Sequence, residues 1–147
     1  MNHRHLLAAF GLTALLGGPA LAVDNPSELP GATVVSADHA KELAAKGAQL
    51  FDVRSANEYA EAHIAGAKNV PYKEKSDKKV GFDAGQDSFD LAKLPADKGA
   101  GMIFYCNGIE CWKSYKAGVT AVKAGYKKVY WLRGGLPEWK GKAYPVE

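Results

Sequence analysis

The chain has 147 residues, of which 47% are hydrophobic and 24% charged, and it contains two cysteines. This composition excludes an intrinsically disordered chain, which would be poorer in apolar residues, and a disulfide scaffold, which would be richer in cysteine. The formal net charge of +3 is too weak to indicate nucleic acid as a partner, because no basic stripe interleaved with aromatic residues accompanies it.

The first 22 residues have the pattern of a secretory signal peptide. They open with Arg4 and no acid, continue through an apolar run over residues 6–16, and close at Ala20-Leu21-Ala22. The apolar run is shorter than the roughly 20 residues that a membrane-spanning helix needs, and an A-x-A ending is typical of a signal-peptidase cleavage site. We therefore expect cleavage after Ala22, a periplasmic protein with no later membrane association, and a single domain over residues 23–147.

Strand and helix patterns alternate along the rest of the chain, which predicts an α/β domain with a mainly parallel sheet. The expected strands cover residues 32–35, 49–53, 67–71, 102–105 and 128–132. Helices are expected after a cap at Ser36, after the capping box of Ser55 and Glu58, over 112–124, and as a last turn over 136–139.

Two segments carry weaker signals. Residues 23–31 contain two prolines and are expected to be strapped to the surface or left loose. Residues 72–101 have many charges and no clear period, so we expect a surface excursion with one short helix near 89–94. The lysines within residues 73–79 lie among acids, which is typical of a solvated loop rather than a binding patch.

The segment from Cys106 to Cys111 joins the purely apolar strand 102–105 to the helix 112–124. Open α/β folds bind their ligands at the carboxyl ends of such strands. The N-terminus of the helix beyond has unpaired N–H groups and a dipole, which favour negative charge on sulfur or on a bound oxyanion. We therefore predict that Cys106 is a nucleophile rather than a small core residue. Lys113 in the first turn of the helix either adds positive charge for this site or is a surface residue that opposes the helix dipole, and the sequence leaves both open.

A series of short motifs runs through the chain in a fixed order. They are Phe51-Asp52-Val53-Arg54 with Glu58-Tyr59, His63-Ile64-Ala65-Gly66-Ala67 with Asn69-Val70-Pro71, Phe104-Tyr105-Cys106, Gly125-Tyr126 with Val129, and Leu132-Arg133-Gly134-Gly135 with Trp139 and Pro145. In this order the chain resembles the rhodanese-like sulfurtransferases, from about Val34 to Val146. The resemblance implies a three-layer α/β domain with a five-stranded, mainly parallel sheet and helices on both faces.

The resemblance also implies a reaction. Cys106 would take a sulfane sulfur from a donor such as thiosulfate, hold it as a persulfide against the loop amides, and pass it to a thiophilic acceptor such as cyanide or a protein thiol. No metal or organic cofactor is implied, neither His39 nor His63 has a partner at metal-ligand spacing, and we expect a monomer. The expected substrate-binding residues are Asn107, Gly108, Ile109, Glu110, Cys111, Trp112, Lys113 and Arg133.

The loop departs from the family pattern. Typical members have a six-residue loop that begins with the cysteine and ends in arginine, followed by serine or threonine, and the related phosphatases have one residue more. Here the first basic residue after Cys106 is Lys113, with Ser114 behind it, and Cys111 occupies the arginine position. Phosphoryl chemistry is therefore disfavoured, because lysine does not replace bidentate recognition by a guanidinium.

Three interpretations of Cys111 stay open. It resolves a Cys106 persulfide or sulfenate by forming a disulfide, it forms a static disulfide that silences the nucleophile, or it packs at the helix start beside Trp112. Geometry decides among them. A bridge over so short a loop would add little stability, so we interpret the pair as chemical.

The other family positions have mainly structural interpretations. Asp52 and Arg54 are expected to pair with each other or with loop amides, Glu58 to cap a helix, and His63 to anchor a loop. Arg133 is expected to contact an anionic donor or the loop backbone. The leading hypothesis is an exported sulfurtransferase. Its alternatives are a thiol redox protein that uses both cysteines and a noncatalytic rhodanese-like binding module.

Overall fold

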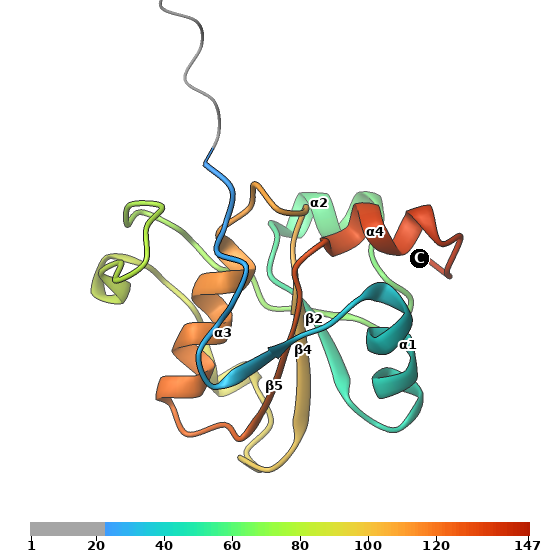
Figure 1. Ribbon diagram of the computed structural model, residues 1–147, viewed down its shortest axis with the longest axis horizontal. Helices are drawn as coiled ribbons and strands as arrows, with labels where there is room; N and C mark the ends of the chain where they lie inside the picture. The colour runs from blue at the N-terminus through green and yellow to red at the C-terminus, as the bar shows by residue number, and fades with distance from the viewer. Residues whose placement is uncertain (1–22) are drawn as a thin grey trace, which may run out of the picture.

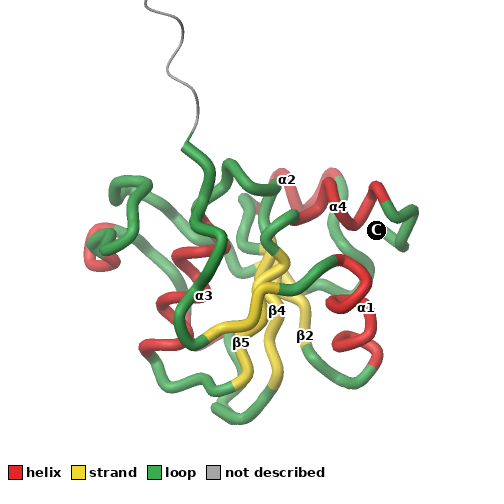
Figure 2. The backbone as a smooth tube through the Cα atoms, in the orientation of Figure 1, coloured by secondary structure: helices red, strands yellow, loops and turns green. Residues whose placement is uncertain are grey.

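The computed structural model describes residues 23–147, so the predicted signal peptide lies outside the described residues. One sheet of five parallel strands, in the order β1-β5-β4-β2-β3, forms the middle of the molecule (Figure 2). This confirms the predicted five-stranded parallel sheet. In chain order the strands are β1 (Ala32–Val34), β2 (Gln49–Asp52), β3 (Lys68–Asn69), β4 (Gly101–Tyr105) and β5 (Lys128–Leu132).

Helices cover both faces of the sheet, as the three-layer prediction requires (Figure 1). Helix α3 (Lys113–Lys123) lies on one face, and α1 (Ala37–Ala45) and α4 (Gly135–Gly141) lie on the other. The short α2 (Ala56–Glu61) follows β2. Within residues 23–147, no helix is long and apolar enough to cross a membrane.

The central strand β4 is buried on both sides. Met102 and Phe104 belong to the core cluster that packs on α3, whereas Ile103 and Tyr105 belong to the cluster under α1 and α4. All four side chains are fully buried. A strand covered on both faces cannot alternate polar with apolar residues, which explains the continuous apolar run in the sequence.

Local capping signals in the sequence are met in the structure. The Ser36 side chain accepts the backbone N–H of His39 at the start of α1, and both hydrogen bonds of the Ser55–Glu58 capping box are present. Helix α4 is longer than the predicted last turn. It continues to Gly141. Its Trp139 side chain is buried and donates the indole N–H to the Pro145 carbonyl, which fixes this part of the helix.

The excursion between β3 and β4 contains two 3₁₀ turns, η1 (Ala84–Gln86) and η2 (Leu91–Lys93). The helix predicted near 89–94 is therefore only one turn long. Pro95 explains its early end, because a proline disfavours helical backbone at the residue before it. The lysines of residues 73–79 are exposed, as predicted for a solvated loop.

Two charged residues tie the excursion to the domain. Asp87 accepts the backbone N–H groups of Lys75 and Ser76, both at 2.7 Å, and the hydroxyls of Tyr72 and Ser76 at 2.5 and 2.6 Å. Lys116 of α3 is fully buried and donates to the carbonyl and hydroxyl oxygens of Ser76 at 3.1 and 2.8 Å. The stretch without periodicity is thus held by these hydrogen bonds together with isolated apolar anchors, since Tyr72, Phe82 and Leu94 are buried in the core.

The Asp87 bonds predict a pH dependence of stability. Burial opposes ionisation of Asp87, but hydrogen bonds from Ser76 and Tyr72 outweigh it and lower the pKa from 3.8 to about 2. The stabilisation is therefore complete above pH 3.8 and is lost as the pH falls through about 2. Asp87→Asn is expected to lower the free energy of unfolding at neutral pH by about 1–3 kcal/mol in urea titrations.

The exposed Asp77 offers the matched control, since no hydrogen bond of its side chain occurs in the described part of the chain. Asp77→Asn should leave both the stability and its pH profile near those of the parent. A wild-type acid profile that persisted unchanged in Asp87→Asn would contradict the assignment.

Candidate functional site

Cys106 and Cys111 are joined by a disulfide at the carboxyl end of β4. Their Cα atoms are 6.3 Å apart, within the usual range for such bonds. Cys106 is only 1% exposed and belongs to the core cluster under α3, whereas Cys111 is half-buried. The two sulfurs therefore differ in access, and the outer one belongs to Cys111.

The bond narrows the three interpretations of Cys111. Packing beside Trp112 is wrong as its sole role, because its sulfur is bonded to Cys106. A resolving cysteine and a silencing disulfide both require this bond, so both remain after the geometry is known.

The exposed side chain of Asn107 is bonded to the half-buried Glu58 and to the buried Arg54. Its side-chain N–H donates to Glu58 at 2.6 Å, and Arg54 donates to its carbonyl oxygen at 3.3 Å. The guanidinium of Arg54 is paired with the fully buried Asp52, with a shortest contact of 2.7 Å, and Asp52 also accepts the Tyr105 hydroxyl at 2.8 Å. The loop is therefore connected by hydrogen bonds to β2 and β4.

These contacts test the structural predictions for the same residues. The Asp52–Arg54 pair is confirmed, and it reaches the loop through the side chain of Asn107 rather than through amides. Glu58 is a cap as predicted, but it has a second role as acceptor for Asn107, and this hydrogen bond is the main cause that lowers the pKa of Glu58. His63 is the predicted anchor, with ring nitrogens on the Tyr59 carbonyl and Glu147.

Asn25, which the sequence analysis did not single out, holds the other side of the loop. Its backbone N–H donates to the Ile109 carbonyl at 2.6 Å, and its side-chain N–H groups donate to the carbonyls of Cys111 at 2.9 Å and Gly108 at 3.4 Å. The Trp112 indole N–H donates to the Val23 carbonyl at 2.9 Å. The N-terminal segment, blue in Figure 1, is thus strapped down beside the loop, which decides between the two predicted alternatives.

The expectation for Arg133 needs correction. Its Nε donates to the Asn25 side chain at 2.8 Å and to the Pro26 carbonyl at 2.9 Å, and its Nη2 donates to the Asn25 carbonyl at 3.0 Å. Arg133 therefore contacts the N-terminal segment instead of the loop backbone, and it supports the loop indirectly through Asn25. It does not line the hollow beside the disulfide.

A surface hollow of about 310 Å³ opens beside Cys111. Glu74 in its wall is paired with the buried Lys116 at 2.8 Å, so its charge is already balanced. The wall's remaining charges are two lysines and one glutamate, a balance that favours an anion. Predicted residues and residues of the excursion line the hollow together: Glu74, Lys78, Asn107, Glu110, Cys111, Trp112 and Lys113.

The predicted residues Gly108 and Ile109 are absent from this lining and form the outer turn of the loop. Gly108 has a positive φ of 121° and accepts the Cys111 N–H at 3.1 Å, while Ile109 is exposed. Among the amides of residues 107–111, that of Cys111 alone donates to another backbone group of residues 23–147. The remaining N–H groups make no backbone hydrogen bond, and the start of α3 has no side-chain cap; unpaired N–H groups at a helix start favour an anion.

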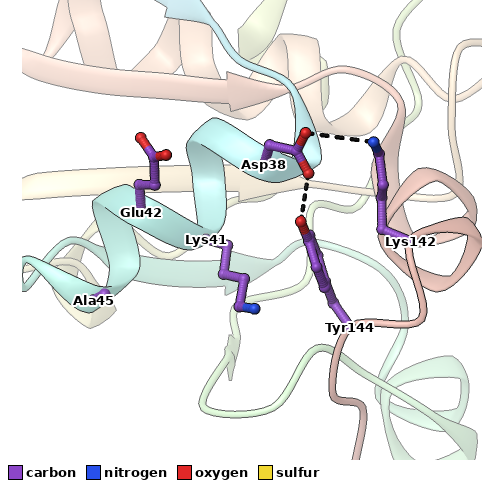
Figure 3. A pocket seen from close by; sticks show the side chains of 6 residues that line it. All are labelled: Asp38, Lys41, Glu42, Ala45, Lys142 and Tyr144. Carbon is purple, nitrogen blue, oxygen red and sulfur yellow. Dashed lines mark hydrogen bonds and ion pairs between the residues drawn. The ribbon is translucent and has the colours of Figure 1, made fainter.

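A larger hollow of about 540 Å³ lies elsewhere, between α1 and the chain end (Figure 3). Its polar groups bind one another: Asp38 accepts the Tyr144 hydroxyl and lies 3.4 Å from the Lys142 ammonium, and Lys41 lies over the Tyr144 ring (Figure 3). It contains neither cysteine. In the described range 23–147, no group of three or more metal-ligating side chains is present.

Comparison with known proteins places this geometry in a family. A family model described as a rhodanese-like domain matches residues 36–142, which include both cysteines and their loop. The chain belongs to the rhodanese-like family. YqhL, an uncharacterized protein of Bacillus subtilis, is 33% identical over 95 residues, and the match covers 65% of this chain and 63% of YqhL. The chain therefore spans less than two thirds of that relative.

A second curated relative and a solved structure show similar levels of sequence identity. Thiosulfate sulfurtransferase 18 of Arabidopsis thaliana is 31% identical over 117 residues, with 77% of this chain and 83% of that protein covered. The solved structure of BH2092 from Bacillus halodurans has a TM-score of 0.59 at 24% identity, covering 78% of this chain and 76% of that one. The rhodanese-like fold and family membership are thus shown, and curated relatives of the chain include a protein named thiosulfate sulfurtransferase.

Close approach of α4 to the loop predicts a specific sensitivity at Gly135. Its φ is +62°, and a Cβ there would overlap the Cys106 carbonyl oxygen and lie 2.7 Å from the Gly108 nitrogen. Gly135→Ala should lower the free energy of unfolding by at least about 1–3 kcal/mol, measured by urea titration. Gly141→Ala in the same helix meets nothing within 4 Å and should be nearly neutral. Equal losses in both variants would refute the close-approach argument.

The Asn25 contacts predict that removing one side chain loosens the loop. Asn25→Ala leaves the Cys111 carbonyl and part of Arg133 without partners, so we expect a loss of about 1–3 kcal/mol in unfolding free energy. Hydrogen exchange of the Cys111 amide, which donates to the Gly108 carbonyl, should also become faster. Asn57→Ala, at an exposed position on α2, is the control and should change neither quantity. Unchanged exchange in Asn25→Ala would show that the strap does not restrain the loop.

Proposed function

We propose that the reduced form of this protein transfers sulfane sulfur from a thiosulfate-like donor through a persulfide on Cys106. The observation that carries the proposal is the position of Cys106. It ends the central parallel strand of a rhodanese-like domain, where loop amides and the start of α3 are available to negative charge. The name of the Arabidopsis relative, a thiosulfate sulfurtransferase, supports the choice of donor.

The chemistry has two steps. The Cys106 thiolate attacks the outer sulfur of thiosulfate, the bond between the two donor sulfurs breaks, and sulfite leaves with the electron pair. Lys78 and Lys113 in the wall of the hollow attract the dianionic donor, and the loop amides stabilise the persulfide anion. A thiophilic acceptor, such as cyanide or a protein thiol, then removes the outer sulfur.

The disulfide sets a condition for this activity. A sulfur bonded to Cys111 carries no thiolate, so Cys106 attacks a donor only after reduction. We also propose that the protein is exported, since the N-terminal pattern is that of a signal peptide. An exported protein would meet oxidising conditions, which makes reduction a separate step of the cycle.

The test is sulfite release from thiosulfate, with cyanide as acceptor. The chain reduced with dithiothreitol and then desalted should release sulfite, and the unreduced chain should be nearly inactive. Cys106→Ser should abolish the activity by at least about a hundredfold, because the covalent intermediate is lost. Sulfite release by Cys106→Ser at the rate of the reduced parent would disprove the assignment.

The disulfide itself favours a second candidate, a thiol redox protein that uses both cysteines. The intact mass of the reduced Cys111→Ser variant after thiosulfate treatment separates the two. A gain of one sulfur atom supports sulfur transfer. No gain, together with ready reoxidation of the parent pair, supports the redox protein.

A further inference from the structure

We infer that this protein releases the accepted sulfur as sulfide, because Cys111 attacks the persulfide of Cys106 and closes the Cys106–Cys111 disulfide. The inference rests on the proposed persulfide and adds an activity to it. The protein would act as a sulfane-sulfur reductase, whose second substrate is a dithiol that reopens the disulfide.

The loop geometry supports the attack. The disulfide shows that the backbone lets the Cys111 sulfur reach the Cys106 sulfur, which is the inner sulfur of the persulfide. The turn from Gly108 to Cys111 and the hydrogen bond from Asn25 to the Cys111 carbonyl hold Cys111 at this position. Well-oriented internal groups reach effective concentrations on the order of 10⁵ M, so an external thiol competes poorly.

Cys106 and Cys111 differ in burial, and this difference assigns them to different steps: internal attack on the persulfide and reduction of the disulfide by an external thiol. Cys106 is 1% exposed, so its inner sulfur is shielded from large external thiols, and Cys111 is the thiol beside it. Once the disulfide has formed, Cys111 lines the hollow and is the sulfur that an external thiol meets. Attack there expels Cys106 as a thiolate beside the start of α3, where the helix dipole stabilises it.

The steps balance. The Cys111 thiolate forms a bond to the Cys106 sulfur, the bond from Cys106 to the outer sulfur breaks, and the outer sulfur, protonated from solvent, leaves as hydrosulfide. The two cysteines supply the two electrons that reduce the sulfane sulfur. One thiol of an external dithiol then attacks the Cys111 sulfur and releases the Cys106 thiolate; the second thiol attacks the resulting mixed disulfide, closes the external disulfide and releases the Cys111 thiolate. The net reaction converts thiosulfate and a dithiol into sulfite, sulfide and a disulfide.

A single turnover without reductant tests the inference. The full chain is reduced, desalted and mixed with excess thiosulfate, and sulfite, sulfide and intact mass are measured. The parent should release sulfite and sulfide in amounts equal to the protein, and end two hydrogens lighter without added sulfur. The first-order rate constant of sulfide release should not depend on protein concentration, because the attack is internal.

Two serine variants form a matched pair, since each loses one thiol and the same disulfide. Cys111→Ser should release sulfite and gain one sulfur atom, but release no sulfide. Cys106→Ser should release neither sulfite nor sulfide and should gain no sulfur. A parent that keeps the persulfide beside a free Cys111 thiol would overturn the inference. Absence of sulfite and of sulfur uptake in Cys111→Ser would instead overturn the proposed persulfide, so the two failures are distinguishable.

Reduced glutathione tests the entry point of the reductant. The oxidised chain is treated with glutathione, quenched in acid and mapped by peptide mass spectrometry. Glutathione should be found on Cys111, the sulfur that lines the hollow. Glutathione found mainly on Cys106 would overturn the assigned order of the thiol exchange.

Discussion

The buried ion pair of Asp52 and Arg54 is the interaction on which the geometry of the loop depends. Asp52 is fully buried, and its charge is offset by Arg54 and by the Tyr105 hydroxyl. Such a pair is costly to break, because either charge left alone in the interior is unsolvated. Since Arg54 also donates to the Asn107 side chain, the position of the loop is coupled to the sheet interior as well as to the exposed contact of Asn107 with Glu58.

The opposite side of the loop is held by the N-terminal segment and by α4. Asn25 engages three loop carbonyls, and Gly135 brings the first turn of α4 against the loop backbone. Four loop carbonyls, those of residues 106, 108, 109 and 111, thereby have partners, while of the amides of residues 107–111 only that of Cys111 donates to another backbone group. This asymmetry suits the proposed binding of a negatively charged sulfur by the loop.

Much of the fold was predictable from local patterns. The continuous apolar run of β4 indicated a strand buried on both faces, and the capping signals of Ser36 and Ser55 marked two helix starts. The excursion of residues 72–101 was not predictable in detail. Its anchors, Asp87 and the buried Lys116, are charged residues that resemble surface residues in the sequence and become structural only through distant partners.

The sequence by itself determined the α/β class, the order of strands and helices, and the place of Cys106 after a central strand, because these follow from hydrophobic periodicity and local capping. Only the tertiary structure decided that Cys106 and Cys111 are bonded and that Arg133 serves Asn25 rather than a donor. The Arg133–Asn25 contact joins residues more than a hundred positions apart, and the disulfide depends on the turn of one loop. Neither kind of contact leaves a periodic signal in the sequence.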